Sequence, residues 1–364
     1  MDSLKYIYLV MITGYIICLS VNSFEIEELS GKKCYRAKPV VAFLYIIPLI
    51  YFAWQRDLSI GDSGSYTVMF QRLPSDFFGL VSYLEINSKD PGFTIFCWLI
   101  KIVGGTPRFM FLTIAVIQGC SLFYVYRKYS SNYYLSILLF VISTDYVSWM
   151  QNGVRQFLAV SIIFAATSWL LEKRYFRMIL VVLFASLFHQ SALLMMPVIF
   201  IVNGKALNTK MLIVMLLILA SITFLSAFTN ILEGVLQETQ YQNVVSDYTV
   251  GEFVEDDGTN PFRILVYSIP VIIGLVGKKI IDYKDNKVIN LSMNMGMLTA
   301  GFYLVSAFTS GIFLGRIPIY FSLYNYILIP WELKYIFKPS EAKYITILMI
   351  VLYLIFSQIQ FSLF

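Results

Sequence analysis

The chain has 364 residues, of which 58% are hydrophobic and 13% are charged, and its mean hydropathy is +0.72. This composition excludes an ordinary soluble globular protein, in which roughly a quarter of the residues are charged. The net charge of +5 does not indicate a nucleic-acid partner, because in a membrane protein the charges must first be assigned to the two sides of the bilayer. We therefore expect an all-α, polytopic membrane helical bundle that forms a single integral membrane domain over residues 1–364 and binds no nucleic acid.

The four cysteines, at Cys18, Cys34, Cys97 and Cys120, show neither a CxxC motif nor a paired spacing. We predict from this no disulfide, no metal site and no cofactor. The first apolar segment, 4–21, is followed by polar and acidic residues and not by a small-residue cleavage site. It is therefore predicted to be a retained span and not a cleaved signal peptide.

Apolar runs that could cross a bilayer recur along the whole chain. The segment 92–105 is too short to cross comfortably and carries Lys101 in its middle, so we expect a re-entrant or surface-lying helix. The two short runs on either side of His189 are predicted to form a hairpin, and one long tilted span is the alternative. About twelve transmembrane helices are predicted, at residues 4–21, 37–54, 107–126, 133–150, 153–171, 174–188, 190–204, 209–229, 262–281, 288–307, 314–331 and 343–362.

Short cytoplasmic loops collect lysine and arginine, which provides a test of this layout. With the amino terminus outside, the predicted inner loops hold most of the 27 basic residues, whereas a single span over 174–204 would place the basic cluster 278–287 outside. The hairpin therefore fits the charge distribution better. Two longer loops, 55–91 and 230–261, then face outward. The second is rich in acidic residues and is either a functional loop or a solvated acidic one.

The predicted outer side is rich in arginine, whose planar guanidinium suits bidentate binding of phosphate. With Asn152 as the N-cap, Arg155 falls in the first turn of the helix 153–171, where the helix dipole disfavours a cation. A bound anion at this helix terminus would explain the arginine. Snorkelling of Arg155 to lipid head groups is the alternative.

His189 is the only histidine and lies between two long apolar runs. An ionisable residue at such depth is a functional hypothesis, and a neutral histidine that ties two short helices together by hydrogen bonds is the alternative. The first outer loop places several charged residues among glycines and prolines. It contains no HExxH, GxSxG or DxD motif, so metal-dependent and serine-hydrolase chemistry are not indicated.

Five short motifs follow one another along the chain. They are Arg56…Gly61-Asp62-Ser63…Tyr66, Asp90-Pro91-Gly92-Phe93, Asn152-Gly153-Val154-Arg155-Gln156, His189-Gln190-Ser191 and Arg316-Ile317…Tyr320-Phe321. Their order over about residues 50 to 330 resembles the EpsG-like branch of the Wzy-type polysaccharide polymerases. Where that family often shows Gly-Thr-Asp-Thr, this chain has Gly61-Asp62-Ser63-Gly64, and the role of Asp62 is accordingly less secure than that of Arg155.

This resemblance implies an O-antigen, capsule or exopolysaccharide polymerase in the bacterial inner membrane, with its active site facing the periplasm or exterior. Such an enzyme is a metal-independent glycosyltransferase. It would transfer the growing glycan from undecaprenyl diphosphate to a sugar hydroxyl of an incoming lipid-linked repeat unit. The implied partners are this lipid-linked oligosaccharide as donor and acceptor, membrane lipid, and a chain-length regulator and a flippase of the same pathway.

Two other functions remain open, an O-antigen ligase and a flippase or transporter of the lipid-linked unit. The chain shows no convincing internal repeat, which argues against a transporter. In the polymerase, fixed arginines would stabilise the leaving diphosphate, and a general base would deprotonate the acceptor hydroxyl. His189 is the first candidate for this base, with Asp62 or Asp90 the second. The predicted catalytic residues are Arg155, His189 and Asp62, and the predicted substrate-binding residues are Arg56, Tyr66, Arg72, Asp90, Gln156 and Arg316.

Overall fold

The structure of the chain, a computed structural model, describes residues 2–29, 32–87, 89–223, 259–308 and 314–361. The predicted acidic loop 230–261 lies, except for its last three residues, outside the described residues. The chain divides into two compact units, and each is described by itself. Unit 1 is Met1–Ile199 with Ile329–Phe364, and unit 2 is Phe200–Leu328.

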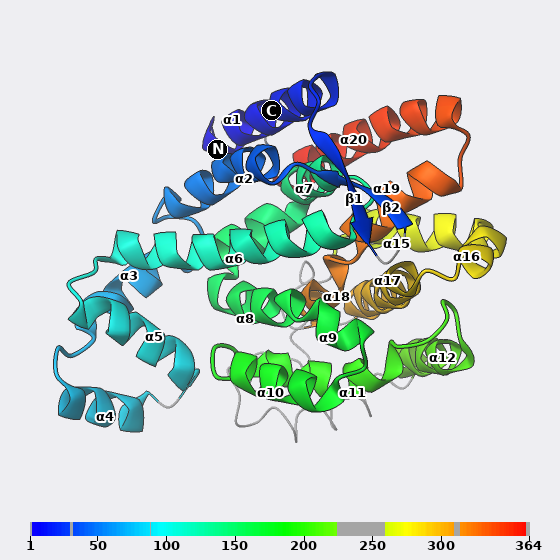
Figure 1. Ribbon diagram of the computed structural model, residues 1–364. Helices are drawn as coiled ribbons and strands as arrows, with labels where there is room; N and C mark the ends of the chain where they lie inside the picture. The colour runs from blue at the N-terminus through cyan, green and yellow to red at the C-terminus, as the bar shows by residue number, and fades with distance from the viewer. Residues whose placement is uncertain (1, 30–31, 88, 224–258, 309–313, 362–364) are drawn as a thin grey trace. The chain divides into compact units, whose positions relative to one another are not determined.

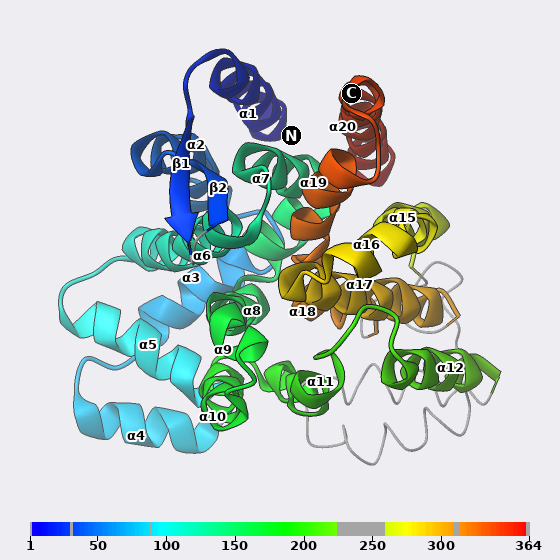
Figure 2. The same cartoon turned by 45° about the vertical axis from the view of Figure 1, so that its right-hand side comes forward.

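Unit 1 is built mainly of helices, with one short hairpin (Figures 1 and 2). Its elements are α1 (Asp2–Ser20), β1 (Phe24–Leu29), β2 (Lys32–Ala37), α2 (Pro39–Trp54), α3 (Ser63–Arg72), α4 (Phe77–Ile86), α5 (Pro91–Ile102), α6 (Pro107–Tyr129), α7 (Tyr133–Ile142), the π-helix η1 (Tyr146–Asn152), α8 (Val154–Ala165), α9 (Thr167–Leu171), α10 (Tyr175–Ser186), the 3₁₀-helix η2 (Gln190–Leu194) and α20 (Pro339–Phe361).

Unit 2 is helical throughout its described residues. Its elements are α12 (Thr209–Thr223), α15 (Pro261–Val276), α16 (Lys278–Lys284), α17 (Lys287–Ser306), the 3₁₀-helix η3 (Leu314–Arg316) and α18 (Ile319–Ser322). Two helices carry the chain between the units, α11 (Met195–Ile201) and α19 (Asn325–Tyr335).

Helices occupy most of the predicted spans within the described residues, but most of these helices are shorter than a span. Among the described residues, α6, α17 and α20 are long and apolar enough to cross a membrane, and the number rises to five if two bent pairs each count as one span. These pairs are α7 with η1, bent by 81°, and α15 with α16, bent by 70°. The chain is therefore consistent with a multi-pass membrane protein, while the prediction of about twelve spans is not confirmed.

Breaks in the helices explain the shorter lengths. The predicted span 133–150 divides because the backbone leaves the α-helix after Ile142 and continues as η1, and the predicted span 153–171 divides at Ala166 into α8 and α9. The predicted span 314–331 likewise becomes η3, α18 and part of α19. An apolar run in the sequence reports burial in lipid or protein alike, so hydropathy alone does not show where a helix bends.

The hairpin of β1 and β2 departs from the all-α prediction. Its antiparallel register pairs Phe24 with Ala37. The guanidinium of Arg127, in the last turn of α6, donates to the Glu25 carboxylate at 2.7 Å and to the Ala37 carbonyl at 2.9 Å. One side chain thereby fixes both strands of the hairpin to the carboxyl end of α6.

The core of unit 1 is formed where α6 packs between α2 and α8. Every residue of α7 is buried beside this layer. A Cβ at Gly119 of α6 would lie 2.5 Å from the Ile50 side chain of α2, so glycine is what permits this close approach. On the other side, Ser121 donates to the Ser161 carbonyl of α8 at 2.7 Å. α6 therefore positions α8 and the arginine at its head.

The predicted short helix at 92–105 is present as α5, and its lysine has a structural partner. The ammonium of Lys101 donates to the carbonyls of Gln71, at 2.8 Å, and of Leu73. These carbonyls end α3, where the backbone acceptors have no partner within their own helix. The cation also complements the negative end of the α3 dipole. The placement of α5 at the membrane stays a prediction.

In unit 2 the buried helix α17 packs between α12 and α15. The side-chain amide nitrogen of Asn294 donates to the Val202 carbonyl at 2.9 Å, and its amide oxygen accepts from the backbone amide of Leu207 at 3.1 Å. This side chain therefore fixes the connection that follows α11 against the middle of α17.

Candidate active site

The site is centred on Arg155, which lies in the first turn of α8 as predicted. The predicted N-cap, Asn152, is wrong, because Asn152 ends the π-helix η1 and Gly153 takes the N-cap position. A Cβ at Gly153 would come within 3.1 Å of the Trp149 ring, so glycine allows α8 to begin directly against η1. π-Helical turns are rare and frequently occur at functional sites.

The guanidinium of Arg155 is held by three side chains from the loop 55–91 and from α5. Its Nη1 donates to the Asp90 carboxylate at 2.8 Å, and its Nε donates to the Tyr66 hydroxyl at 3.1 Å. Its Cζ lies 5.3 Å from the centre of the Tyr66 ring and 5.8 Å from that of Phe93. The anion expected beside this arginine is thus supplied in part by the protein itself.

Asp90 is placed by an unusual backbone turn. Its φ of 50° is in the left-handed region, and Pro91 follows as the first residue of α5. Its side chain accepts a hydrogen bond from the backbone amide of Gln190 at 3.2 Å, in addition to the one from Arg155. Burial raises the pKa of the Asp90 carboxyl, while the nearby Arg155 charge, the Gln190 amide and Lys89 act in the opposite direction.

Gly92 brings α5 against the end of α10. Its amide donates to the Leu187 carbonyl at 2.8 Å, and a Cβ at this position would lie 2.6 Å from the Leu187 Cβ. No other amino acid fits this contact without a shift of the backbone. Since Asp90 precedes Gly92 and Gln190 follows Leu187, the contact also sets the distance between the Asp90 carboxylate and the Gln190 amide.

His189 lies in extended backbone between α10 and η2, where the sequence predicts a break. Its Nδ1 is 2.7 Å from the Ser191 hydroxyl oxygen. The same hydroxyl accepts a hydrogen bond from the side-chain amide of Gln156 at 3.3 Å. The histidine is buried, with 4% of its surface exposed. Gln156 and Arg155 are adjacent on α8, so this network adjoins the Arg155–Asp90 pair.

The Gly61-Asp62 turn of the first outer loop packs on the head of α8. Gly61 has a φ of +51°, and a Cβ there would lie 1.8 Å from the Asn152 side chain. Asp62 begins α3, is exposed to solvent, and its charge acts on both Arg155 and Tyr66. This turn therefore adds a solvent-facing carboxylate beside the guanidinium.

The family model of EpsG matches residues 39–364. The chain belongs to the EpsG family. This membership indicates a polysaccharide polymerase and agrees with the resemblance of the five motifs. No curated protein and no solved structure matches the chain.

In this EpsG-family chain, Arg56 is a different kind of arginine from Arg155. It is 2% exposed, and its guanidinium donates to the Ala53 carbonyl at 2.6 Å and to the Gln151 carbonyl at 2.7 Å. It lies 4.9 Å from the centre of the Phe111 ring. Arg56 thereby ties the end of α2 to the end of η1, directly behind the head of α8.

Two predicted arginines are not brought to this cluster within unit 1. Arg72 is exposed in the last turn of α3, at the end where Lys101 binds the carbonyls. Arg316 belongs to η3 of unit 2. The cluster of unit 1 therefore contains Asp62, Tyr66, Asp90, Arg155, Gln156 and His189, with Arg56 behind it.

Sequence reasoning missed two members of the site. Lys89 stands next to Asp90, and burial together with the Arg155 charge lowers its pKa. Phe93 forms one of the two aromatic faces at the Arg155 guanidinium. The motif Asp90-Pro91-Gly92-Phe93 could have indicated the role of Phe93. A partly buried arginine at a helix terminus needs both a counter-charge, here Asp90, and a flat apolar surface, here Phe93.

The arrangement leaves part of the arginine available. The side chain of Arg155 is 22% exposed, and its Nη2 makes no hydrogen bond to the described part of the chain. Over that same part, no group of three or more His, Cys, Asp or Glu side chains could hold a metal ion. Trp149, in the π-helix before Arg155, is buried and donates its indole N–H to Asp145 at 3.0 Å.

Proposed function

We propose that this chain polymerises lipid-linked oligosaccharide repeat units at the outer face of the bacterial inner membrane. The donor would be the growing glycan on undecaprenyl diphosphate, and the acceptor a sugar hydroxyl of the incoming lipid-linked unit. The observation that supports this proposal is the Arg155 guanidinium, oriented by Asp90 and Tyr66 and still partly open to solvent. A planar guanidinium fixed in this way can donate hydrogen bonds to phosphate oxygens in a defined direction.

The diphosphate would bind at the head of α8. Asp90 and Tyr66 use Nη1 and Nε of Arg155, so Nη2 remains to donate to a phosphate oxygen. The first amide groups of α8 carry no side-chain cap and add the positive end of the helix dipole. Lys89 would supply a second cation. Because these donors are already oriented, they stabilise the charge that develops on the leaving diphosphate without reorganisation.

The transfer forms a bond between the acceptor oxygen and the anomeric carbon and breaks the bond between that carbon and the phosphate oxygen of the donor. The acceptor proton passes to a general base, and the lipid diphosphate leaves with the bonding electron pair. We assign the base to His189, whose ring is oriented by Ser191 at 2.7 Å. Asp62, exposed beside Arg155, is the second candidate.

Arg56 would act as a positioning residue and not as a ligand of the substrate. Both of its hydrogen bonds go to carbonyls of the chain, and one of them ends the π-helix that precedes Arg155. We further propose that the fixed cations act without a metal ion, so the purified enzyme should keep its activity in EDTA. A flippase and a chain-length regulator of the same pathway are the proposed partners, since lipid-linked units must reach the outer face before they are joined.

Surface polysaccharide analysed on gels tests this function. Cells that lack the chain should carry one repeat unit on the surface acceptor, and the wild-type chain should restore a ladder. Arg155→Lys is expected to fail like Arg155→Ala, because an ammonium cannot bond Asp90, Tyr66 and phosphate in the same plane. Arg174→Lys is the matched control, since that arginine is exposed and pairs with Glu172 away from the site.

Other outcomes of this experiment would contradict the proposal in distinct ways. If deletion removes even the single unit, the chain acts as a ligase or a flippase. If Arg155→Lys restores a full ladder, the assignment of diphosphate binding to an oriented guanidinium is wrong. For the base, His189→Ala should abolish the ladder at matched protein level, whereas a full ladder with His189→Ala and none with Asp62→Asn would move the base to Asp62.

A further inference from the structure

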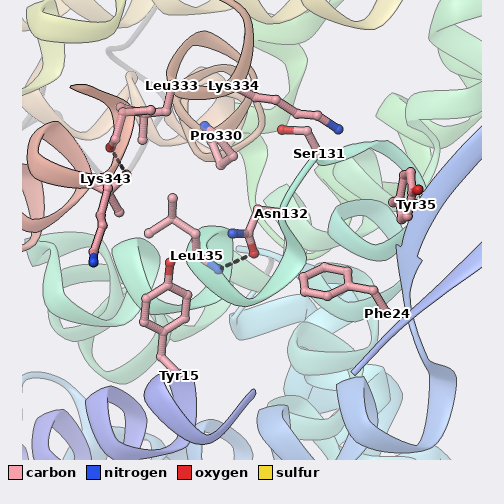
Figure 3. Close-up of a pocket in the computed structure, with 12 residues that line it drawn as sticks. Tyr15, Phe24, Tyr35, Ser131, Asn132, Leu135, Pro330, Leu333, Lys334 and Lys343 are labelled. Carbon is pink, nitrogen blue, oxygen red and sulfur yellow. Dashed lines mark hydrogen bonds between the residues drawn. The ribbon is translucent and has the colours of Figure 1, made fainter. Parts of the chain in front are cut away.

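A cavity lies in unit 1 among α1, the hairpin, the start of α7 and the helices α19 and α20. Its volume is about 500 Å³ (Figure 3). Lys334 of α19 and Lys343 of α20 line it, and Tyr15, Tyr35 and Ser131 add hydroxyl groups. In the view of Figure 3, Lys334 lies near Ser131 on one side and Lys343 lies near Tyr15 on the other. The cavity shares no residue with the Arg155 site.

The lining has the chemistry of a site for an anion with an apolar body. Among the described residues that line it there is no carboxylate to neutralise the two lysines. The ammonium of Lys334 lies 5.9 Å from the centre of the Tyr35 ring, a contact that orients the cation and leaves its N–H groups available. The Ser131 hydroxyl is buried and finds no hydrogen-bond partner in the described part of the chain. Phe24 and Leu135 supply the apolar surface.

The cavity lies beyond the carboxyl end of α6, whereas the head of α8, which carries Arg155, lies beside the middle of that helix, where Gln118 donates to the Val154 carbonyl at 3.3 Å. α6 has 23 residues and spans about 34 Å at 1.5 Å per residue. At its start Arg108 donates to the Arg56 carbonyl, and Arg56 binds the end of η1. At its end Arg127 binds the hairpin that forms one wall of the cavity. This length matches the roughly 30 Å of a bilayer core, so the two sites would lie at different depths along it.

The leaflet follows from the charges. Lys334 lies in the last turn of α19, Lys338 in the connection that follows, and Lys343 near the start of α20. Short cytoplasmic connections collect lysine, and the cytoplasmic leaflet carries anionic lipids that attract such clusters. A phosphate group at that interface is therefore available at high local concentration.

We propose that this cavity binds the phosphate head group of an anionic phospholipid of the cytoplasmic leaflet. Lys334 and Lys343 contact the phosphate, the Ser131 hydroxyl donates to one of its oxygens, and Phe24 and Leu135 contact the glycerol and the first methylenes of the acyl chains. The bound lipid links α19 and α20 to α7 and the hairpin, and so stabilises unit 1. This inference does not depend on the identity of the glycan that the chain transfers.

Thermal unfolding of the purified full-length protein in mixed micelles tests the proposal. Phosphatidylglycerol should raise the unfolding temperature in a saturable manner, and phosphatidylcholine at the same concentration should raise it much less. The double variant Lys334→Gln/Lys343→Gln should weaken the apparent affinity for phosphatidylglycerol about 30-fold, the loss expected for two lysines near an anionic lipid. Lys279→Gln/Lys287→Gln carries the same change of charge on exposed lysines of unit 2 and should leave the affinity unchanged.

Two further measurements separate a built site from general charge attraction. Ala342→Phe fills the cavity without changing charge, and it should reduce the phosphatidylglycerol effect while the protein still unfolds cooperatively. An equal loss in the Lys279/Lys287 control, or equal protection by phosphatidylcholine, would overturn the site. Protection by inorganic phosphate at the same concentration would overturn the assignment to a lipid. A measurable polymer ladder from the Lys334/Lys343 variant keeps a failure here distinct from a failure of the proposed function.

Discussion

The Arg155–Asp90 pair gives the most direct test of the site. Asp90→Asn and Arg155→Gln each remove one charge and preserve the approximate shape of the side chain. Either single variant leaves the other charge partly buried without its partner, whereas the double variant removes both charges. A double-mutant cycle built from these three variants therefore isolates the interaction between the two side chains.

The expected coupling follows from burial and distance. The Asp90 side chain is 3% exposed, and the Arg155 side chain is 22% exposed, with 2.8 Å between Nη1 and the carboxylate. Two unit charges about 4 Å apart attract by about 4 kcal/mol at an effective dielectric constant near 20. Solvent reaches the arginine and screens part of this, so we expect a coupling free energy of about 1–3 kcal/mol. The exposed pair Glu172–Arg174 should show below about 1 kcal/mol.

The cycle requires the free energy of unfolding of the purified protein in one detergent, measured for all four forms by denaturant titration with matched slopes. The polymer ladder of each form is recorded in parallel, and both single variants should lose it. If the two single effects add to within about 0.5 kcal/mol, the pair does not form in the solution protein, and our account of how Arg155 is oriented is wrong.

Three other predictions concern Gly92, the Asp90 carboxyl and the buried Glu332 of α19. Gly92→Ala should destabilise the protein by about 1–3 kcal/mol and abolish the ladder, since the added Cβ would lie 2.6 Å from the Leu187 Cβ. Adding Leu187→Gly to this variant should restore part of the stability and part of the ladder. If the effects of the two substitutions on stability simply add, the contact is refuted. Because burial raises the pKa of Asp90 above its usual value near 4, folding takes up a proton just above that pH. The stability of the wild type relative to Asp90→Asn should therefore fall as pH rises from about 4 through the raised pKa and be level at neutral pH; a rise over this window would contradict the assignment. Glu332→Leu should raise the free energy of unfolding by about 1–4 kcal/mol, because both carboxylate oxygens are buried without a hydrogen bond in the described structure. A loss of stability in this variant would contradict the prediction and indicate that Glu332 has a partner in the membrane.

Much of the candidate site could be predicted from local sequence. Arg155 lies in the first turn of a helix, and the helices on either side of His189 end and begin where the apolar runs are interrupted. Both features depend on a few adjacent residues, so they can be seen in a linear pattern. The motif order was likewise sufficient to identify the family over most of the chain.

The partners of these residues could not be predicted in the same way. Asp90 and Arg155 are 65 positions apart, and Arg56 and Gln151 are 95 apart. An outward arginine has the same appearance in the sequence whether it binds substrate or a carbonyl of its own chain. Only packing separates the two, since it buries Arg56 against Gln151 and leaves Arg155 partly open.

The sequence by itself determined the hydrophobic surrounding and the mainly helical character of this protein. Few charges and long apolar runs require a hydrophobic surrounding, and the backbone in such a surrounding must satisfy its hydrogen bonds within helices. The tertiary structure alone decided where those helices break. The 81° bend between α7 and η1 sets the direction of α8, and with it the position of Arg155 beside Asp90. The physical reason is that hydropathy measures transfer out of water, which is the same for lipid and for a protein interior, whereas a bend depends on contacts between residues far apart in the chain.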